Sequence, residues 1–471
     1  MNNTFVKNNQ NPNIIFFFTD DQRFDTIHAL GNDEIITPNI DSIVENGTTF
    51  KNNYIMGGTS GAVCMPSRAM LMTGRTLFHL ERQGQNIPED HIMLGETLQK
   101  AGYNTFGTGK WHNGTSSYAR SFNSGGEIFF GGMDDHWNVP AFNFDPTGKY
   151  ETRCNRTVDF VTQRVVQRMC DHIHAGKHSS ELFCDATIDY LDSYEDDDPF
   201  FMYVSFMAPH DPRTMPKEYL DMYDPEQIKL PESFMSEHPF DNGELKIRDE
   251  MLAGFPRTPE EIKRHIAAYY AMITHADTQI GRVLKTLEET GKVDNTIIVF
   301  AGDNGLALGR HGLMGKQSVY EHSVKVPLVM SGPGVPNNTK SEAFTYLIDI
   351  YPTLCDLCNV NIPETVEGKS LVPAMSNPKE KIRENLLFAY TKLHRGVRDE
   401  QFKLIEYVVD GKRTTQLFDL KTDPHETKNL ADNDDYSHVI EKLRKELVRW
   451  RDELDDTQEQ GQIFWDGFMK V

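Results

Sequence analysis

The sequence predicts an α/β protein in which a large, mostly parallel β-sheet is sandwiched by helices. A smaller C-terminal subdomain of antiparallel strands and a helix follows it. Continuous apolar runs rich in Ile, Val and Phe indicate strands that are buried on both faces, as is typical of parallel sheets. Segments with helical spacing of apolar residues separate these runs, and the alternation stops near Ser376. We therefore place an α/β domain at residues 1–375 and an α+β subdomain at residues 376–471.

Four of the apolar runs lead into polar residues of the kinds found in active sites. The runs and the residues behind them are Asn13–Thr19 with Asp20 and Asp21, Tyr103–Phe106 with Lys110 and His112, Phe200–Phe206 with His210, and Thr296–Ala301 with Asp303 and Asn304. Ligands of α/β sheets bind beyond the carboxyl ends of the strands. We therefore expect these side chains to meet in one site.

Signals for helices and for a hairpin define the rest of the fold. Thr258–Glu261 is a capping-box sequence with Pro in the first turn, and apolar residues recur at helical spacing beyond it. In the C-terminal part, Phe402–Val409 and Thr414–Phe418 flank a turn-prone Asp-Gly, which predicts a hairpin. The apolar residues of Val439–Leu454 fall on one face of a last helix.

Composition excludes some classes of function. The 471 residues carry a formal charge of −22, with 38% hydrophobic and 25% charged residues, as in a globular protein with an ample core. This acidity argues against nucleic acid as a partner, and a polyanionic substrate would need a local positive pocket. No run approaches the ~18 apolar residues of a membrane span. Met1–Gln10 is not the apolar core of a signal peptide, so we expect a cytoplasmic protein, or a periplasmic or secreted one if a leader has been removed.

The six cysteines are too few for a disulfide scaffold in a chain of this length. Cys355-x-x-Cys358 is compatible with a metal or redox site. However, it lies in a stretch with helical spacing, where Leu354 and Cys358 are one turn apart. We expect both cysteines in the apolar core.

Cys64 is the exception, because its surroundings favour a nucleophile. Pro66 suits the first turn of a helix, and we predict a short helix over Ser67–Thr73 that Gly74 terminates. Cys64 would then lie just ahead of a helix N-terminus, where free N–H groups favour negative charge, and Arg68 adds a permanent cation. The alternatives are a buried, inert thiol and a cysteine protease, whose local signatures are missing.

Asp20, Asp21, Asp303 and Asn304 offer only oxygen ligands, which suits a hard cation such as Ca²⁺ or Mg²⁺. Adjacent aspartates without a cation would repel each other, so one divalent metal explains the pairs economically. Solvated loop aspartates are the alternative for either motif alone. No cluster of Cys and His in the sequence suggests zinc.

The segment Cys64-x-Pro66-Ser67-Arg68, followed by Thr73-Gly74-Arg75, resembles the signature of type I sulfatases in the alkaline-phosphatase-like superfamily. The resemblance extends from about Asn13 to about Leu430. It implies that a maturation enzyme oxidises Cys64 to formylglycine, whose hydrated aldehyde is the nucleophile. It also favours Ca²⁺ over Mg²⁺ at the predicted metal site.

Further motifs match the same family. The resemblance implies that Lys110 and His112, in Gly-Lys-Trp-His, bracket the formylglycine. It also implies that His210, in Ala-Pro-His, acts at the leaving group and that Lys316 contacts the sulfate. A structural role for His311 is as consistent with the sequence as a catalytic one. The implied activity is hydrolysis of a sulfate ester, with a sulfated carbohydrate favoured by analogy with the family.

Two other functions stay open at the level of the sequence. One is a phosphonate or phosphate ester hydrolase of the same superfamily, and the other is a glycan-binding pseudo-sulfatase with an unmodified cysteine. Contacts to a sugar ring or to a second anionic group could come from His136, Trp137, Arg395 or Arg398, although a structural role is the simpler interpretation for each. The polar stretch at residues 231–257 is expected to border the substrate cleft.

Overall fold

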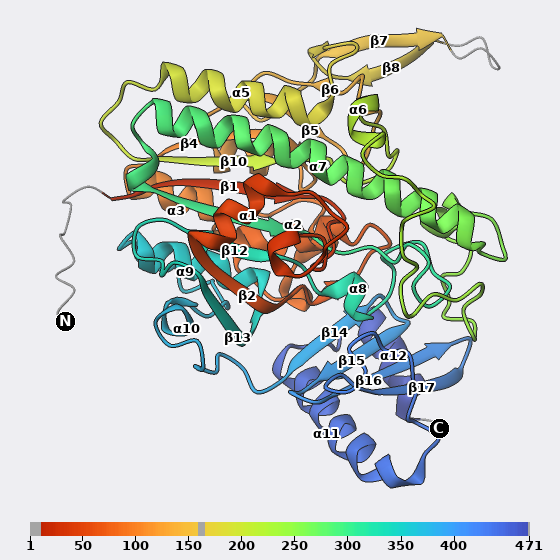
Figure 1. The fold of residues 1–471 in the computed structure, drawn as a ribbon. Coiled ribbons are helices and arrows are strands. Elements are labelled where there is room, and N and C mark those ends of the chain that lie inside the picture. Colours follow the sequence, from red (N-terminus) through yellow and green to blue (C-terminus); the bar gives the residue numbers. More distant parts are fainter. Residues whose placement is uncertain (1–10, 159–164, 470–471) are drawn as a thin grey trace.

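The computed structural model describes residues 11–158 and 165–469. Its centre is an eight-stranded sheet with the order β13-β2-β12-β11-β1-β10-β4-β5 (Figure 1). Strand β12 is antiparallel to both of its neighbours, and the other pairs are parallel. The strands are β1 (Asn13–Thr19), β2 (Gly47–Tyr54), β4 (Asn104–Trp111), β5 (Ser124–Phe130), β10 (Phe200–Ser205), β11 (Thr296–Gly302), β12 (Leu328–Ser331) and β13 (Thr339–Tyr346). A mostly parallel sheet between helices confirms the predicted fold class.

Strand β1 shows why this sheet is covered on both faces. All of its side chains are buried, and successive residues point to opposite faces. Ile14, Phe16 and Phe18 pack in a core with helices α2 (Cys64–Thr73), α3 (Leu94–Lys100) and α9 (Ile350–Leu357). Ile15 and Phe17 pack on the other face with α1 (Pro38–Glu45), α5 (Ser179–Ser193) and α7 (Pro259–Glu289). Each such side chain contributes about 1.5–3 kcal/mol of burial free energy.

The long helix α7 begins where the sequence predicts. Thr258 Oγ1 accepts a hydrogen bond from the Glu261 N–H at 3.3 Å, and Pro259 occupies the first turn. The Glu261 carboxylate does not return this bond, because it lies 3.3 Å from the Gly254 N–H instead. Only half of the predicted capping box therefore forms.

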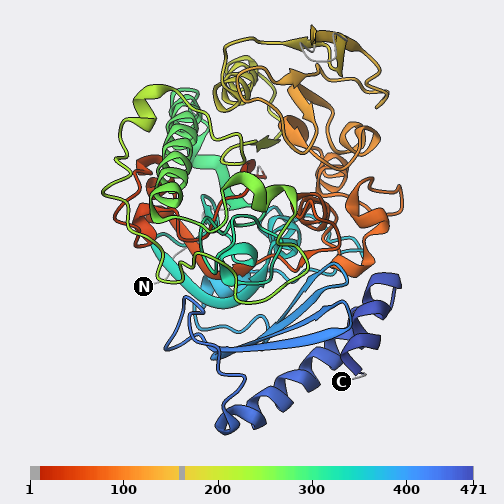
Figure 2. The same ribbon diagram turned by 90° about the vertical axis from the view of Figure 1, so that its right-hand side faces the viewer.

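The C-terminal part forms a second, five-stranded sheet with two helices on it (Figure 2). The predicted hairpin turn forms, since Asp410 and Gly411 both have positive φ. Gly57–Gly58 joins this sheet as β3, parallel to β14. The smaller sheet thus includes residues that lie shortly before Cys64, and the boundary at residue 375 stays a prediction. The elements are β14 (Leu386–Tyr390), β15 (His394–Arg398), β16 (Phe402–Val409), β17 (Lys412–Asp419), α11 (Ser437–Glu453) and α12 (Glu459–Met469).

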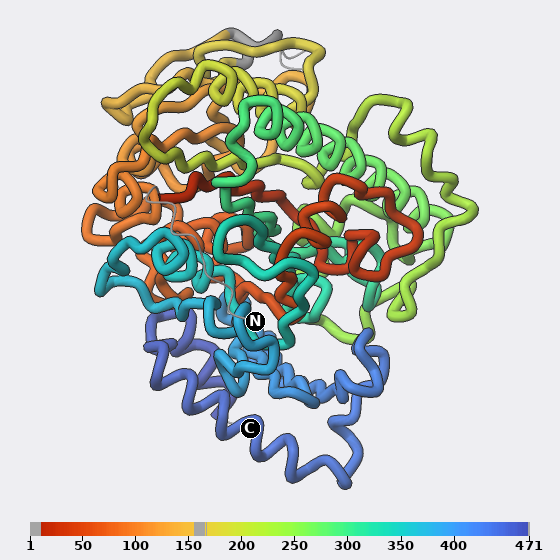
Figure 3. Tube along the Cα trace, turned by 60° about the vertical axis from the view of Figure 1, so that its left-hand side comes forward, coloured from red at the N-terminus to blue at the C-terminus, as the bar shows by residue number. Residues whose placement is uncertain are grey.

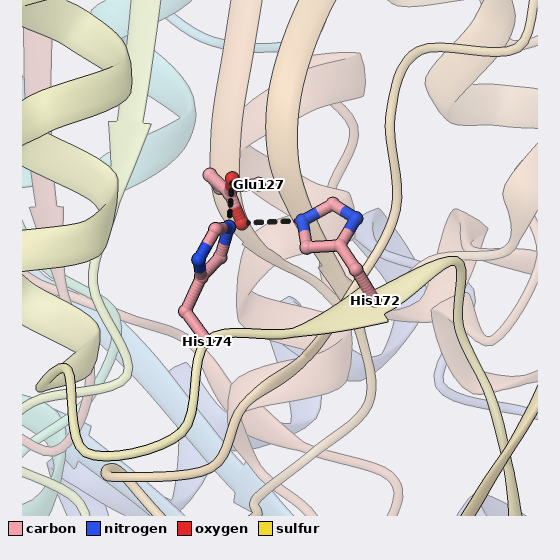
Figure 4. Close-up of side chains that lie close together, drawn as sticks. All are labelled: Glu127, His172 and His174. Atoms are coloured by element: carbon pink, nitrogen blue, oxygen red, sulfur yellow. Dashed lines mark hydrogen bonds and ion pairs between the residues drawn. The ribbon is translucent and has the colours of Figure 1, made fainter.

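A lobe between β5 and α5 lies at the opposite end of the molecule from this subdomain (Figures 1 and 3). Glu127 ties the lobe to the edge strand β5, because its carboxylate lies 2.8 Å from His172 Nε2 and 3.1 Å from His174 Nε2 (Figure 4). Glu127 occupies a β-bulge with a φ of 51°. The lobe contains β6 (Pro140–Ala141), β7 (Arg153–Val158), β8 (Val165–Met169) and β9 (His172–Ile173).

The remaining helices are short, and none of the helices described is long and apolar enough to cross a membrane. All six cysteines are free. Cys355 and Cys358 are buried in the apolar core, as predicted. The short helices are α4 (Thr115–Ser121), α6 (Lys217–Leu220), α8 (Glu321–Val324) and α10 (Val372–Ser376).

Candidate active site

Helix α2 presents Cys64 in its own first turn. The prediction that the helix begins after Pro66 was wrong by one turn, because Val63 already adopts helical φ and ψ angles of −55° and −32°. Gly74 ends the helix as predicted, with a φ of 65°. Cys64 is 2% exposed, and its Sγ lies 3.4 Å from His112 Nδ1 and 3.6 Å from Lys110 Nζ.

The strand order explains why the predicted residues meet. Strands β11, β1, β10 and β4 are neighbours and run in parallel, so their carboxyl ends lie at one edge of the sheet. The loops that follow these strands, together with α2, converge there. The contacts described below form three groups, which two further contacts join: the Asp21 N–H donates to Asp303 Oδ1 at 3.0 Å, and Arg68 Nη2 lies 4.0 Å from Asp20 Oδ2. All of the predicted residues are thereby connected: Asp20, Asp21, Cys64, Arg68, Lys110, His112, His210, Asp303, Asn304 and Lys316.

Three buried cationic side chains form ion pairs with three buried carboxylates. Arg68 Nε and Nη2 lie 2.9 Å and 2.8 Å from Asp303 Oδ2. Lys110 Nζ donates to Asp20 Oδ2, and Lys316 Nζ donates to Asp21 Oδ1 at 2.6 Å. Asn304 Nδ2 also donates to Asp21 Oδ1, at 2.7 Å.

Two oxygens of this cluster fit a divalent cation. Asp20 Oδ1 and Asn304 Oδ1 are buried and have no hydrogen-bond partner among the described residues. An unsatisfied buried polar atom costs about 1–3 kcal/mol, which a bound cation would recover. Glu127, His172 and His174 form another cluster of side chains that could bind a metal. Their ligand atoms already have partners, because both histidines pair with the Glu127 carboxylate (Figure 4).

The raised pKa of one carboxylate also fits a bound cation. Burial raises the pKa of Asp303 to about 7, and the negative charge of Asp20 adds to this effect. Burial alone would raise the pKa of Asp20 as well, but Lys110 and His210 outweigh it and hold that pKa below its usual range. A divalent cation would offset the repulsion between the carboxylates. It would also leave the site net positive, because the three cations already balance the three carboxylates.

The two histidines differ in their surroundings. Burial, with Lys110 next in importance, lowers the pKa of His112 well below its ordinary value, so its imidazole is neutral and able to accept a proton. His210 Nδ1 lies 2.8 Å from the Asp211 carbonyl oxygen, and its Nε2 lies 3.7 Å from Asp21 Oδ2. Burial also raises the pKa of Cys64, and a protonated thiol is a poor nucleophile. The environment therefore disfavours chemistry by an unmodified cysteine.

Other predicted residues lie elsewhere. His311 has a structural position, with Nε2 3.0 Å from the Glu426 carbonyl oxygen and the ring stacked on Tyr320. Arg395 is buried against Asp456, and Arg398 against Glu321, both involving the C-terminal subdomain. Trp137 packs edge-on against His178, and His136 Nε2 lies 3.1 Å from the His210 carbonyl oxygen. Of these, His136 supports the site by holding the main chain of His210.

Some supporting residues were missed by sequence reasoning. Ser205, the last residue of β10, accepts a hydrogen bond from Arg68 Nη1 at 2.6 Å. The Gly132 carbonyl accepts from Lys110 Nζ at 2.5 Å, and a Cβ at Gly132 would lie 2.9 Å from the His112 ring. Ser205 could have been found from its place at the end of a predicted strand. Gly132 carries no such signal.

A cavity of about 970 Å³ adjoins the site at Asp211, next to His210. Arg248 and Leu252, from the stretch at residues 231–257, lie in its wall. That this stretch borders a substrate cleft stays a prediction. The other lining residues are Met133, Asp134, Asp135, Arg168, Pro212, Arg213, Glu261, Arg264, His265 and Ala268.

Comparison with known proteins identifies the family. A sequence profile described as Sulfatase matches residues 12–360, and one described as N-sulphoglucosamine sulphohydrolase, C-terminal, matches residues 309–453. An arylsulfatase of Clostridium perfringens (strain 13 / Type A) is 31% identical, over 93% of this chain and 94% of that protein. An N-acetylglucosamine-6-O-sulfatase of Bacteroides thetaiotaomicron is 28% identical, over 95% of this chain and 86% of that protein.

Solved structures share the fold. A protein in complex with its substrate D-glucosamine-2-N,6-O-disulfate gives a TM-score of 0.77 at 23% identity, with 96% of this chain and 99% of that chain covered. A phosphonate monoester hydrolase of Agrobacterium radiobacter gives 0.72 at 22% identity, with 94% and 96% covered. At such identities, these similarities show only that the fold is shared. From the profile match and the Clostridium relative, the chain belongs to the sulfatase family, as a type I sulfatase of the alkaline-phosphatase-like superfamily, and is a sulfuric ester hydrolase.

Proposed function

We propose that the chain cleaves the sulfate ester of a sulfated carbohydrate with a formylglycine made from Cys64. The observation that carries this proposal is the buried Cys64 thiol, 3.4 Å from a neutral imidazole and 3.6 Å from an ammonium group. Its conversion is a two-electron oxidation at Cβ, in which oxygen replaces the departing sulfur. A separate maturation enzyme would carry it out with its own oxidant. The Cys64 Sγ position then stands for an oxygen of the hydrated aldehyde.

Asp20, Asp21, Asp303 and Asn304 would hold one divalent cation, Ca²⁺ in preference to Mg²⁺. The two orphaned oxygens and the purely oxygen donor set support this assignment. When bound, the cation would offset negative charge on the sulfate oxygens and on the nucleophilic hydroxyl.

Different side chains carry out the separate steps of the proposed reaction. One hydroxyl of the hydrated aldehyde loses its proton to water and attacks sulfur, and the new S–O bond replaces the bond to the sugar oxygen. His210 gives a proton to that departing oxygen. His112 removes the proton of the second hydroxyl, the aldehyde C=O reforms, and sulfate leaves with the oxygen that attacked. Arg68, Lys110 and Lys316 spread the charge of the sulfate group, and water then rehydrates the aldehyde.

A sulfated carbohydrate is the substrate class that the relatives favour. One similar protein is named an N-acetylglucosamine-6-O-sulfatase, and an ulvan-active sulfatase of Formosa agariphila is 27% identical over 94% of this chain. The cavity beside His210 has the volume to admit a saccharide. Degradation of sulfated polysaccharides is therefore the proposed role. The second candidate is phosphonate or phosphate ester hydrolysis, favoured by the similarity to a multifunctional alkaline phosphatase superfamily protein of Trinickia caryophylli, 26% identical over 93% of this chain.

Parallel substrates test this proposal. Protein produced with a formylglycine-generating enzyme is assayed for sulfate release from sulfated sugars and 4-nitrophenyl sulfate, and for hydrolysis of a phenyl phosphonate ester. We expect sulfate release that Cys64→Ala abolishes and that Cys154→Ser, a cysteine change outside the site, leaves intact. Faster turnover of the phosphonate than of every sulfate ester would instead establish the second candidate. Binding of sulfated sugars by the mature protein without turnover would indicate a pseudo-sulfatase.

A further inference from the structure

The cavity beside His210 contains a cation that the proposed reaction does not use. Arg213 lies three residues after His210 and lines the cavity. Its Nε and Nη2 atoms are buried and have no hydrogen-bond partner among residues 11–158 and 165–469. No ion pair joins Arg213 to a carboxylate in those ranges either. Burial of these two atoms without a direct partner is costly, since nothing repays their loss of water.

The acids of the cavity are engaged with other groups. Arg248 binds both carboxylate oxygens of Asp211, with Nη1 2.9 Å from Oδ1. Asp211 therefore makes no direct ion pair with Arg213 and acts on it only as a nearby negative charge. The remaining acids are Asp134, 3.8 Å from Arg168, Asp135, which accepts from the Trp137 N–H and Asn138 Nδ2, and Glu261, 3.3 Å from the Gly254 N–H.

Helix α7 adds two further donors to the same cavity. Arg213 Nη1 donates to His265 Nδ1 at 3.2 Å, so the imidazole carries its own proton on Nε2. Burial, with Arg213 beside it, lowers the pKa of His265 to about 4, which leaves this ring neutral near pH 7. Arg264 is exposed at the cavity and has no ion pair among the described residues. The uncompensated positive charge of the cavity is therefore concentrated at Arg213 and Arg264.

We propose that this cavity binds a second oxyanion of the substrate, a sulfate or carboxylate group carried by the saccharide that bears the scissile sulfate. Arg213 is its principal ligand, and Arg264 and His265 complete the site. Asp211, one residue from His210, lines the cavity, so the cavity adjoins the residue proposed to protonate the departing sugar oxygen. This inference rests on the proposed function. It explains how a protein with a formal charge of −22 could select a doubly charged substrate.

Paired ligands test the site. Glucosamine 6-sulfate is compared with N-sulfated glucosamine 6-sulfate, and N-acetylglucosamine 6-sulfate is compared with its disaccharide with glucuronate. Each is measured as a competitive inhibitor of 4-nitrophenyl sulfate hydrolysis. The first pair detects a second sulfate and the second pair a carboxylate. The ratio of the two inhibition constants within a pair reports recognition of the second group, because effects on overall activity cancel.

The wild type should bind the doubly charged member of at least one pair more tightly, by about tenfold or more. Arg213→Ala should reduce that preference by about 10- to 100-fold, as for the loss of a charge-assisted hydrogen bond. Arg213→Lys should retain part of it. Arg264→Ala should reduce it by about two- to fivefold, as for an exposed charge. Lys263→Ala removes the same charge from the adjacent position of α7, outside the cavity wall, and should leave the ratio unchanged.

A wild type without preference in both pairs would overturn the inference, and so would an Arg213→Ala protein that keeps the full preference. If Arg213→Ala does not fold, the comparison of Arg264→Ala with Lys263→Ala decides the matter. Calorimetric titration of the same ligands into protein with an unmodified Cys64 gives the ratio without turnover. Failure of sulfate hydrolysis and failure of second-anion binding are therefore distinguishable.

Discussion

Removal of the His210 imidazole should separate sugar sulfates from aryl sulfates. The ring is oriented by its Nδ1 contact with the Asp211 carbonyl oxygen at 2.8 Å, which leaves Nε2 facing the cluster of carboxylates. His210→Ala deletes the ring but keeps the main-chain carbonyl that His136 Nε2 contacts at 3.1 Å. The loop therefore keeps an anchor, and the loss should concern proton transfer.

The expected size of the effect follows from the leaving group. A positioned general acid contributes about 10²–10⁴-fold, which is about 2.7–5.4 kcal/mol of activation free energy at about 1.36 kcal/mol per factor of ten. A sugar alkoxide needs that proton, so kcat/KM for a sugar sulfate should fall by the full amount. Nitrophenolate is stable without a proton, so 4-nitrophenyl sulfate should lose about tenfold or less.

The assay is kcat/KM for both ester types, measured on the same preparations of wild type, His210→Ala and His425→Ala. His425 is a half-exposed histidine whose Nε2 lies 3.9 Å from Glu232, so its removal controls for histidine loss in general. Equal losses on sugar and aryl esters in His210→Ala would refute the role as acid. A selective loss in His425→Ala would show that the comparison does not report on the site.

Four further outcomes are expected. Peptide mass spectrometry should find Cys64 converted from thiol to aldehyde after co-expression with a maturation enzyme; full activity of a wholly unmodified protein would contradict the mechanism. Asp303→Ala should lose both bound metal and activity, as seen by elemental analysis, whereas stoichiometric zinc that tracks activity would refute the calcium or magnesium assignment. His112→Ala should slow sulfate release and accumulate a sulfated enzyme detectable by intact mass, and rapid turnover would exclude it as the base. Burial raises the pKa of Asp277 to about 6 from 3.8, so its ionisation opposes folding as pH rises through that window. Relative to Asp277→Asn, the wild type should therefore lose up to about 3 kcal/mol of unfolding free energy between about pH 4 and pH 7 in urea titrations, and a constant difference would contradict the shift.

The sequence predicted the fold class and the gathering of the site because both depend on local patterns. A continuous apolar run indicates a strand buried on both faces, and parallel strands necessarily end at one edge. The residues behind β1, β4, β10 and β11 therefore lie at one edge of the sheet, and the strand order, which the sequence does not determine, makes them neighbours. The helix start at Cys64 was missed because Pro66 marks a first turn without excluding an earlier one.

Contacts made by long-range packing could not be predicted from the sequence. Gly57–Gly58 pairs with β14, and Gly132 lies against His112, through backbone approaches that leave no periodic signal. Arg395 and Arg398 carry the same charge as Arg213, yet the first two are buried against Asp456 and Glu321.

By itself, the sequence determined which side chains gather at the candidate site, since motif spacing and strand ends are local properties of the chain. Only the tertiary structure decided which cationic side chains have no ion-pair partner among the described residues. Whether an arginine is paired depends on which carboxylates the folded chain brings within about 4 Å of it. Asp211 is turned to Arg248, and Arg213 contacts His265 of α7 instead of an acid. That arrangement, set by the packing of distant segments, is why Arg213, three residues after His210, has no ion-pair partner in the part of the chain that the structure describes.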